Sequence, residues 1–281
     1  ALKPLVPRRY IAGPDVNTGE QEMQWFFEAN GDWRACTGKP ATVCMRLFGK
    51  PGEKCGIPHE FGSTGFGVAH AAAVAASHIK LDISKATVAI EGFGNVGTFA
   101  AKYLSDFGAR IVAVSDSKGA IYNQDGLNVS DLHDTKEKTG SVVNYRPGKV
   151  LGNKEIFKLP VDILIPAALP DVIGKDNVNS VKAKIVVEAA NIPITPEMEE
   201  ILHKKGVLVV PDFVANAGGV ISSYAEYRGY NPKKMFELVE NKIKRNVKIV
   251  LERAEKENVK PRDAALRIAE ERINKVKRKV K

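Results

Sequence analysis

Short apolar runs alternate with longer amphipathic stretches through the middle of the chain. Nearly every residue in these runs is apolar, and many are β-branched, which is typical of strands buried on both faces of a sheet. Strands alternating with helices favour parallel pairing and right-handed crossovers. We therefore predict an α/β fold with a doubly wound parallel sheet. Its strands are Thr87–Ile90, Ile111–Val114, Val161–Pro166, Ala183–Glu188 and Val207–Val210.

Helices are expected between and around these strands. The predicted helices of the central region are Ser63–Ile79, Val96–Phe107, Gly126–Lys138 and Pro196–Lys205. Nearer the N-terminus, Glu20–Asn30 has helical periodicity, and Asn17 or Thr18 is placed to cap it. Helices dominate after Ala217, where two amphipathic segments, Met235–Glu257 and Arg262–Lys279, are split by a proline.

Composition narrows the class of protein. The 281 residues are 44% apolar, yet no apolar run reaches the roughly 18 residues that suggest a membrane-spanning helix. The N-terminal segment also lacks the apolar core of a signal peptide. The net charge of +9 lies in the helical stretch from Lys233 to Lys281, where acidic and basic residues mix. A solvated helix face or an acidic partner is therefore expected there, and a nucleic-acid or membrane partner is not.

The cysteines point to a reducing compartment and away from a metal site. Cys36, Cys44 and Cys55 are too few for a disulfide framework in a chain of this length. Together with His59 they are spaced more widely than the two to four residues that separate zinc-binding cysteines. We predict a cytoplasmic protein without a bound metal.

A glycine-rich turn follows the strand Thr87–Ile90. It has the pattern G-x-G-x-x-G and opens a helix. In this context Gly92 permits the tight turn, Gly94 lets the backbone approach a pyrophosphate, and Gly97 lets the helix pack on the strand. The N-terminus of the helix adds free N–H groups and a partial positive charge. Strand, turn and helix together predict a dinucleotide site at Gly92, Phe93, Gly94, Asn95, Val96 and Gly97.

The choice of dinucleotide depends on the end of the next strand. Asp116 lies about 20 residues beyond Gly97, where a carboxylate binds the adenosine ribose. That carboxylate favours NAD, because it repels a 2′-phosphate. Ser117 and Lys118 beside it are compatible with NADP. The sequence therefore predicts NAD or NADP, with Asp116 and Ser117 in the site.

Eight segments carry a wider pattern. They are YIAGPDVNT (10–18), TGKP (37–40), TGFGVA (64–69), VAIEGFGNVG (88–97), VAVSDSKGAIYN (112–123), ILIPAAL (163–169), EAANIPITPE (188–197) and PDFVANAGGVISSY (211–224). In this order they resemble the glutamate dehydrogenase group of amino-acid dehydrogenases. The resemblance implies reversible oxidative deamination of L-glutamate to 2-oxoglutarate and ammonia, with hydride transfer to NAD(P). It also implies a homohexamer.

The resemblance assigns further residues. Asp15 would be the catalytic proton shuttle, and Ser223 would contact the γ-carboxylate of glutamate. Asn216 would contact cofactor or substrate. The remaining cofactor residues that it implies are Thr64, Ala167, Ala168 and Asn191.

Two departures from the family pattern stand out. The catalytic lysine of the family lies in a glycine-rich segment upstream of the residue that matches Asp15, and neither Lys39 nor Lys50 is its equivalent. Glu60 stands where the family has an arginine for the substrate α-carboxylate. We therefore expect that most of the substrate domain is missing from this chain. The alternatives are a dehydrogenase for another small amino acid, or a non-catalytic nucleotide-binding paralogue.

These observations predict three parts. Residues 1–58 are expected to be the remnant of a substrate domain. Residues 59–228 are expected to form a Rossmann-like dinucleotide-binding domain. Residues 229–281 are expected to form C-terminal helices that pack back on the domain interface.

Overall fold

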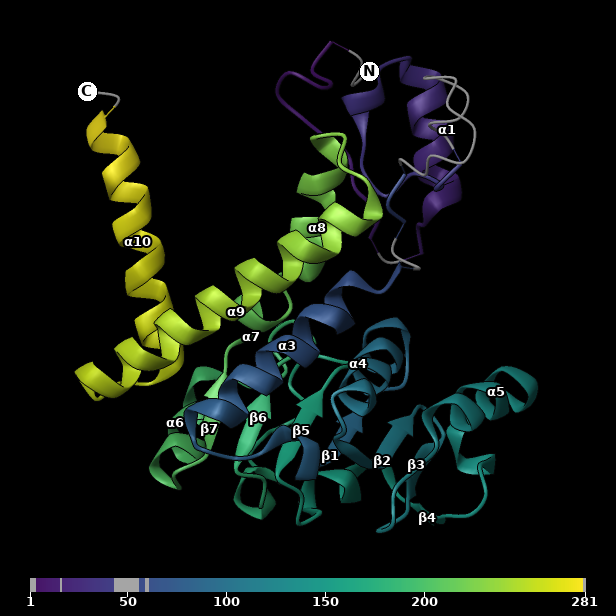
Figure 1. Cartoon of the computed structure of the whole chain (residues 1–281), viewed down its shortest axis with the longest axis vertical. Helices are drawn as coiled ribbons and strands as arrows, with labels where there is room; N and C mark the ends of the chain where they lie inside the picture. The colour runs from purple at the N-terminus through teal and green to yellow at the C-terminus, as the bar shows by residue number, and fades with distance from the viewer. Residues whose placement is uncertain (1–3, 16, 43–55, 59–60, 280–281) are drawn as a thin grey trace. The chain divides into compact units, whose positions relative to one another are not determined.

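The computed structural model describes residues 4–15, 17–42, 56–58 and 61–279 (Figure 1). These residues form two compact units. Unit 1 contains residues 1–63 and 218–242, and unit 2 contains residues 64–217 and 243–281. The functional domain boundaries expected from the sequence stay a prediction.

Unit 2 is built on a seven-stranded sheet with the order β4-β3-β2-β1-β5-β6-β7. Its parallel strands are β1 (Thr87–Glu91), β2 (Arg110–Asp116), β5 (Ile163–Pro166), β6 (Ile185–Val187) and β7 (Leu208–Val210). These are the five strands predicted from the apolar runs. Most of their residues are buried, as expected for strands covered on both faces. The prediction of an α/β fold is confirmed.

The sheet is mixed, whereas the sequence predicted parallel strands only. After β2 the chain turns back into β3 (Gly119–Tyr122), which pairs with β2 antiparallel, and β4 (Lys149–Leu151) pairs with β3 antiparallel. The turn between these two strands is tight, because Asp116 at the end of β2 pairs with Gly119 at the start of β3. Gly119 has φ +151°. The strands β3 and β4 are short and contain no long apolar run, so they are recognised only by their pairing in the sheet.

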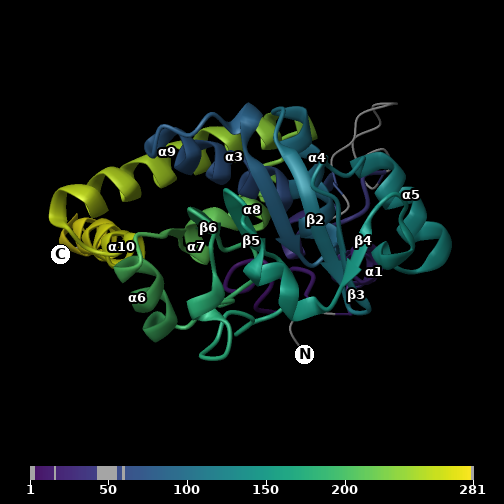
Figure 2. The same ribbon diagram turned by 90° about the horizontal axis from the view of Figure 1, so that it is seen from below.

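Helices flank this sheet. They are α3 (Ser63–His78), α4 (Asn95–Asp106), α5 (Val129–Thr139), α6 (Pro196–Lys204), the four-residue α7 (Asp212–Ala215) and α10 (Pro261–Lys279). The helix α4 packs on β1 and on β2, which lies beside α4 in Figure 2, and α6 and α10 pack on β7. Short 3-10 segments are η3 (Ile83–Lys85), η4 (Val142–Asn144), η5 (Asn153–Lys158) and η6 (Val178–Ser180). Ala89, Leu164 and Val186 belong to one buried cluster that spans the sheet.

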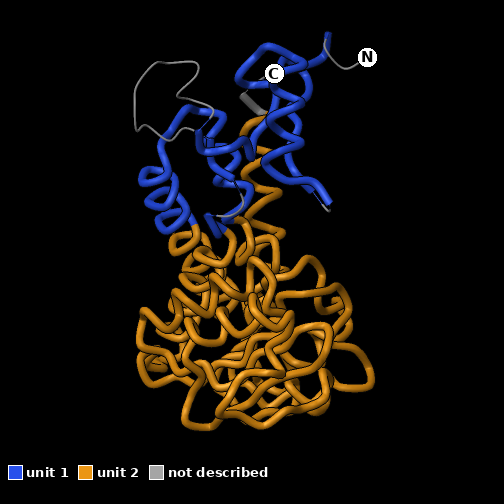
Figure 3. The backbone as a smooth tube through the Cα atoms, turned by 90° about the vertical axis from the view of Figure 1, so that its right-hand side faces the viewer, with its two compact units in different colours: residues 1–63, 218–242 blue, residues 64–217, 243–281 orange. Residues whose placement is uncertain are grey.

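Unit 1 (blue in Figure 3) contains α1 (Glu20–Asn30), η1 (Trp33–Ala35), α8 (Gly218–Tyr227) and the first part of α9 (Pro232–Glu257). A buried ion pair joins its two chain segments. The Lys39 Nζ atom lies 2.7 Å from Glu226 Oε1, and both side chains are fully buried. Glu226 also accepts hydrogen bonds from the backbone N–H groups of Gly38, Lys39 and Ile57.

The start of α1 differs from the prediction. The cap is Gly19, and neither Asn17 nor Thr18 fills that role. The Thr18 hydroxyl accepts from the Asp15 N–H at 2.7 Å, so it closes the preceding loop instead. Glu22, in the first turn of α1, accepts from the Gly19 N–H at 2.7 Å. It thereby satisfies a backbone donor at the N-terminus of the helix.

The C-terminal region forms two helices, as predicted. α9 ends at Glu257 and α10 begins at Pro261, which is favoured at a first helical position. Among the residues that the structure describes, no helix is both long and apolar enough to cross a membrane.

Candidate functional site

The glycine turn has the geometry that its spacing predicts. Gly92 has φ +92°, a left-handed conformation that favours glycine. A Cβ on Gly97 would lie 1.8 Å from the Gly92 carbonyl oxygen, so α4 can approach the turn only because this residue is glycine. A Cβ on Gly94, the N-cap of α4, would meet no described atom within 4 Å. The turn therefore leaves open space in front of the N-terminus of α4.

The residues after β5 lie against this turn. The Ala167 N–H donates to the Glu91 backbone oxygen at 2.7 Å, and the Ala168 N–H donates to Glu91 Oε2 at 3.2 Å. A Cβ on Gly92 would lie 2.6 Å from the Ala168 Cβ. Burial raises the pKa of the Glu91 carboxyl above its usual value. Ala168 thus borders the space that the glycines leave, and Ala167 holds the preceding backbone against β1.

Asp116 closes the other side of this space. Its Oδ1 accepts from the Lys118 N–H at 2.9 Å and from the Ser141 hydroxyl at 3.1 Å, and its Oδ2 accepts from the Val142 N–H at 2.7 Å. These bonds fix the carboxylate at the end of β2. Each oxygen has two lone pairs, so capacity for a further donor remains at Oδ2.

A cavity of about 570 Å³ joins these elements. Its lining includes a cation, Lys136, whose Nζ donates to the Phe93 carbonyl oxygen. Of the predicted cofactor residues, those that line it are Gly92, Phe93, Gly94, Asp116, Ser117 and Ala168.

Thr64, Asn95, Val96, Gly97 and Ala167 are not among the residues that line this cavity. Asn95 and Val96 begin α4. Thr64 is half-buried in the first turn of α3. A Cβ on the adjacent Gly65 would lie 2.6 Å from the Val96 carbonyl oxygen. Close packing of α3 on α4 therefore brings Thr64 near the start of α4.

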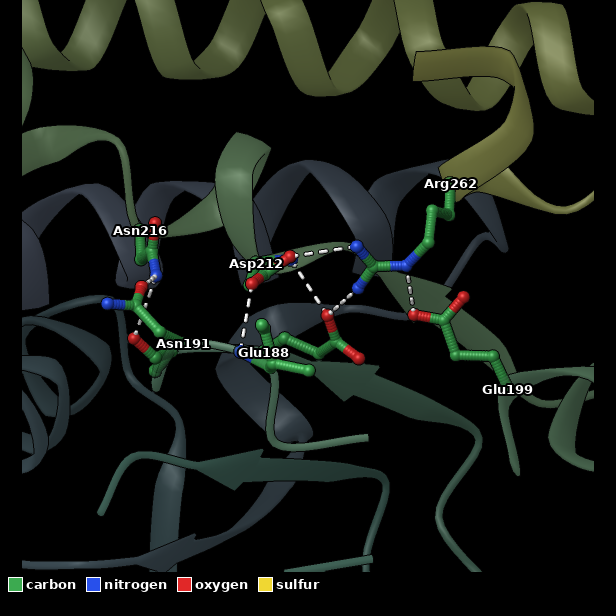
Figure 4. Close-up of polar contacts among 8 residues, drawn as sticks. Glu188, Asn191, Glu199, Asp212, Asn216 and Arg262 are labelled. Atoms are coloured by element: carbon green, nitrogen blue, oxygen red, sulfur yellow. Dashed lines mark hydrogen bonds and ion pairs between the residues drawn. The ribbon is translucent and has the colours of Figure 1, made fainter. Parts of the chain in front are cut away.

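Asn191 and Asn216 form a second polar group on unit 2 (Figure 4). Asn191 follows β6, and Asn216 follows α7, which comes directly after β7. Asn216 Nδ2 donates to Asn191 Oδ1 at 2.8 Å and to the Ala189 carbonyl oxygen at 3.3 Å. The two predicted asparagines are thus brought together at the carboxyl ends of neighbouring parallel strands, where doubly wound sheets bind ligands.

A buried ionic cluster lies next to this pair, and the sequence did not reveal it. Arg262 at the start of α10 contacts three carboxylates. Its Nη2 is 2.6 Å from Glu188 Oε2, its Nε is 2.6 Å from Glu199 Oε1, and its Nη1 is 3.0 Å from Asp212 Oδ1. All three acidic residues are buried. One guanidinium therefore faces three acids (Figure 4).

The cluster holds more acid than base. Burial, and next the neighbouring Glu199 carboxyl, raise the pKa of Glu188 from 4.5 to about 9. Glu188 Oε1 accepts no hydrogen bond within the described part of the chain. At neutral pH this raised pKa favours the protonated carboxyl, which reduces the charge that Arg262 must balance. The sequence did contain a signal for this cluster, because two of its acids lie at strand ends. Glu188 directly follows β6, and Asp212 follows β7 after one proline.

Asp15 and Ser223 belong to unit 1. Asp15 is exposed in the loop that the Thr18 hydroxyl closes. Ser223 is half-buried on α8. Their assigned roles stay predictions.

The remaining candidates fall partly outside the described residues. Lys50, Glu60, Cys44, Cys55 and His59 all lie there. Cys36 is a buried free thiol that donates to the Met23 carbonyl oxygen at 3.2 Å, and burial raises its pKa to about 11. Elsewhere in the described ranges no three His, Cys, Asp or Glu side chains gather in a way that would hold a metal ion.

Comparison with known proteins identifies the family. Residues 55–280 match the family model described as Glutamate/Leucine/Phenylalanine/Valine dehydrogenase. The chain belongs to this family. The resemblance drawn from the eight sequence segments is thereby confirmed.

Two sequence relatives and one solved structure illustrate the similarity. Glutamate dehydrogenase of Aeropyrum pernix is 44% identical over 274 residues, which cover 94% of this chain and 64% of the relative. NADP-specific glutamate dehydrogenase of Saccharolobus shibatae is 45% identical over 218 residues, covering 77% and 50%. The hetero-hexameric glutamate dehydrogenase of Thermus thermophilus has a TM-score of 0.85 at 31% identity, covering 98% and 65%. This chain thus spans between half and two thirds of these proteins.

Proposed function

We propose that the protein takes part in NAD(P)-dependent, reversible oxidative deamination of L-glutamate to 2-oxoglutarate and ammonia. Membership of the amino-acid dehydrogenase family supports this reaction class, and the two relatives described above are named glutamate dehydrogenases. The observation that carries the proposal is the open space in front of Gly94 at the N-terminus of α4. Gly94 and Asp116 line the same cavity.

The residues present fit a dinucleotide. The pyrophosphate would lie at the N-terminus of α4, where backbone N–H groups and the helix dipole favour anions. Asp116 would accept from the adenosine ribose. Lys136 lines the same cavity and supplies a positive charge that a 2′-phosphate would favour. The proposal therefore covers both NAD and NADP.

When bound, the nicotinamide would accept the α-hydrogen of the amino acid as hydride. In this proposal Asp15 moves protons between the amine and water, because its carboxylate can act as a general acid and base. Ser223 and Asn216 contact the substrate, and Thr64 and Asn191 contact the cofactor. Asn216 and Asn191 already share a hydrogen bond.

We also propose that the chain assembles into an oligomer in the cytoplasm. The Thermus thermophilus relative is hetero-hexameric. The buried free thiol of Cys36 suits a reducing compartment.

Titration calorimetry with NADH and with NADPH tests the cofactor part. Gly94→Val fills the space in front of α4, so it should abolish binding while far-UV circular dichroism stays unchanged. Gly13→Val is a matched control in unit 1, because its Cβ would meet only the Thr37 hydroxyl at an ordinary 3.6 Å. Failure of the wild-type protein to bind either dinucleotide would contradict the proposal.

The substrate is tested by the absorbance of the reduced cofactor. In a protein that also carries the lysine-containing substrate segment of the family, L-glutamate should produce it faster than L-leucine, L-phenylalanine or L-valine. Preference for one of those three would favour a dehydrogenase of another amino acid. Cofactor binding without reduction by any of the four would favour the non-catalytic paralogue.

A further inference from the structure

The backbone that carries Asn191 is held in an uncommon conformation. The next residue, Ile192, has φ +49°. This left-handed region is rare for β-branched residues, so the surroundings must hold it there. The Ile192 N–H donates to Asp212 Oδ2 at 2.9 Å, and the Asp171 N–H donates to the Ile192 carbonyl oxygen at 3.0 Å, so both contacts hold the turn.

The same aspartate also holds Asn216. The Asn216 N–H donates to the Asp212 carbonyl oxygen at 2.8 Å, one turn along α7. The side-chain amide of Asn216 then donates to Asn191 Oδ1. Both asparagines therefore depend on Asp212, one through its carboxylate and one through its backbone.

Asp212 is in turn anchored by Arg262. The guanidinium Nη1 is 3.0 Å from Asp212 Oδ1, which leaves Oδ2 directed at Ile192. Arg262 also holds Glu188, whose Oε2 accepts from the Asp212 N–H at 2.8 Å. The planar guanidinium, with five donors in a fixed geometry, contacts all three acidic side chains at once.

We propose that Arg262, acting through Asp212, is a positioning residue that holds Asn191 and Asn216 in the geometry that receives the nicotinamide half of the dinucleotide. The proposal rests on the proposed function. The sheet topology indicates which half of the dinucleotide Asn191 and Asn216 face. The strand order places Asp116 on β2, on one side of the glycine turn after β1, and places β6 and β7 on the other side. A dinucleotide lies across this switch point, so its adenosine and nicotinamide halves face opposite sides.

The test compares two ligands that differ only in the nicotinamide ring. NADH contains this ring, and ADP-ribose lacks it. If the protein prefers NADPH, the matching pair is NADPH and the 2′-phosphate of ADP-ribose. Affinities are measured by calorimetry for wild type, Asp212→Asn and Arg262→Lys. Arg267→Lys is the matched control, because Arg267 lies on the same helix but pairs with Glu257 while half exposed.

Asp212→Asn keeps the shape of the side chain but presents an N–H group to either Arg262 or Ile192, so one of the two contacts is lost. Arg262→Lys keeps the charge but cannot span three carboxylates. Both variants should bind NADH about tenfold more weakly, the effect of losing one hydrogen bond to a charged group. Their affinity for ADP-ribose should stay within about twofold of wild type, and Arg267→Lys should match wild type for both ligands.

The outcomes separate the two proposals. If the variants lose affinity for NADH and ADP-ribose equally, including through misfolding, the cluster has only a structural role. This result would overturn the inference and leave the proposed function standing. Unchanged NADH affinity in both variants would overturn the inference as well. If the wild-type protein binds neither ligand, the proposed function fails and the inference fails with it.

Discussion

Glu188→Gln should change how the stability of unit 2 depends on pH. Burial and the neighbouring Glu199 carboxyl raise the pKa of Glu188 in the folded protein to about 9, whereas an unfolded glutamate has a pKa near 4.5. Between these values the folded state binds one more proton than the unfolded state. The free energy of unfolding therefore falls as pH rises, by up to about 1.4 kcal/mol per pH unit.

Glutamine removes this titration without a large change in shape. Its amide oxygen can accept from Arg262 and from the Asp212 N–H as the carboxyl does. The variant should therefore lack the Glu188 contribution to the slope. Relative to wild type, it should gain up to about 3 kcal/mol of stability between pH 6 and pH 8.

Urea unfolding at pH 6, 7 and 8 measures this difference. Far-UV circular dichroism must be the probe for unit 2, because both tryptophans, Trp25 and Trp33, lie in unit 1. Their fluorescence serves as an internal reference. Glu200→Gln is the control variant, because Glu200 is on the same helix as Glu199 but only half-buried beside Lys204 and Lys260, and its pKa is lowered. It is ionised throughout this range in both states and should leave the slope unchanged.

Parallel pH dependence in wild type and Glu188→Gln would refute the reasoning. It would show that the proton is held elsewhere in the cluster or that Glu188 is ionised when folded. A variant that is less stable than wild type by the same amount at every pH would show that the lost charge matters and the proton does not.

Three further predictions follow from local contacts. Gly97→Ala should lower stability by about 1–3 kcal/mol in urea unfolding, because its Cβ would meet the Gly92 carbonyl oxygen; unchanged stability would contradict the close approach. Lys39→Met should cost about 3–5 kcal/mol, followed by tryptophan fluorescence, because it leaves Glu226 buried without its cation; a neutral effect would mean that the pair adds nothing. Asp116→Ser should shift preference from NADH towards NADPH by about ten- to a hundredfold in calorimetry, and an unchanged ratio would place Asp116 outside the ribose site.

Much of the framework was predictable because it depends on residues that are close in sequence. The apolar runs predicted the five parallel strands. The spacing of Gly92 and Gly97 predicted a turn and a close helix, since a positive φ and a missing Cβ are properties of single residues. Asp116 followed from its distance along the chain. Its binding role, like that of Asp15, stays a proposal.

Other features were decided only by the tertiary structure. The antiparallel strands β3 and β4 are too short to have a pattern of their own, and they exist because β2 offers them an edge. The Arg262 cluster joins side chains as far apart as 74 positions. From the sequence alone, Arg262 is one basic residue in a charged amphipathic helix, and Glu188 is an acid at the end of a strand. A residue pattern records which side chains are apolar. Which buried charges meet, and hence which of them keeps a proton, depends on the packing of α10, α6 and β7 in three dimensions.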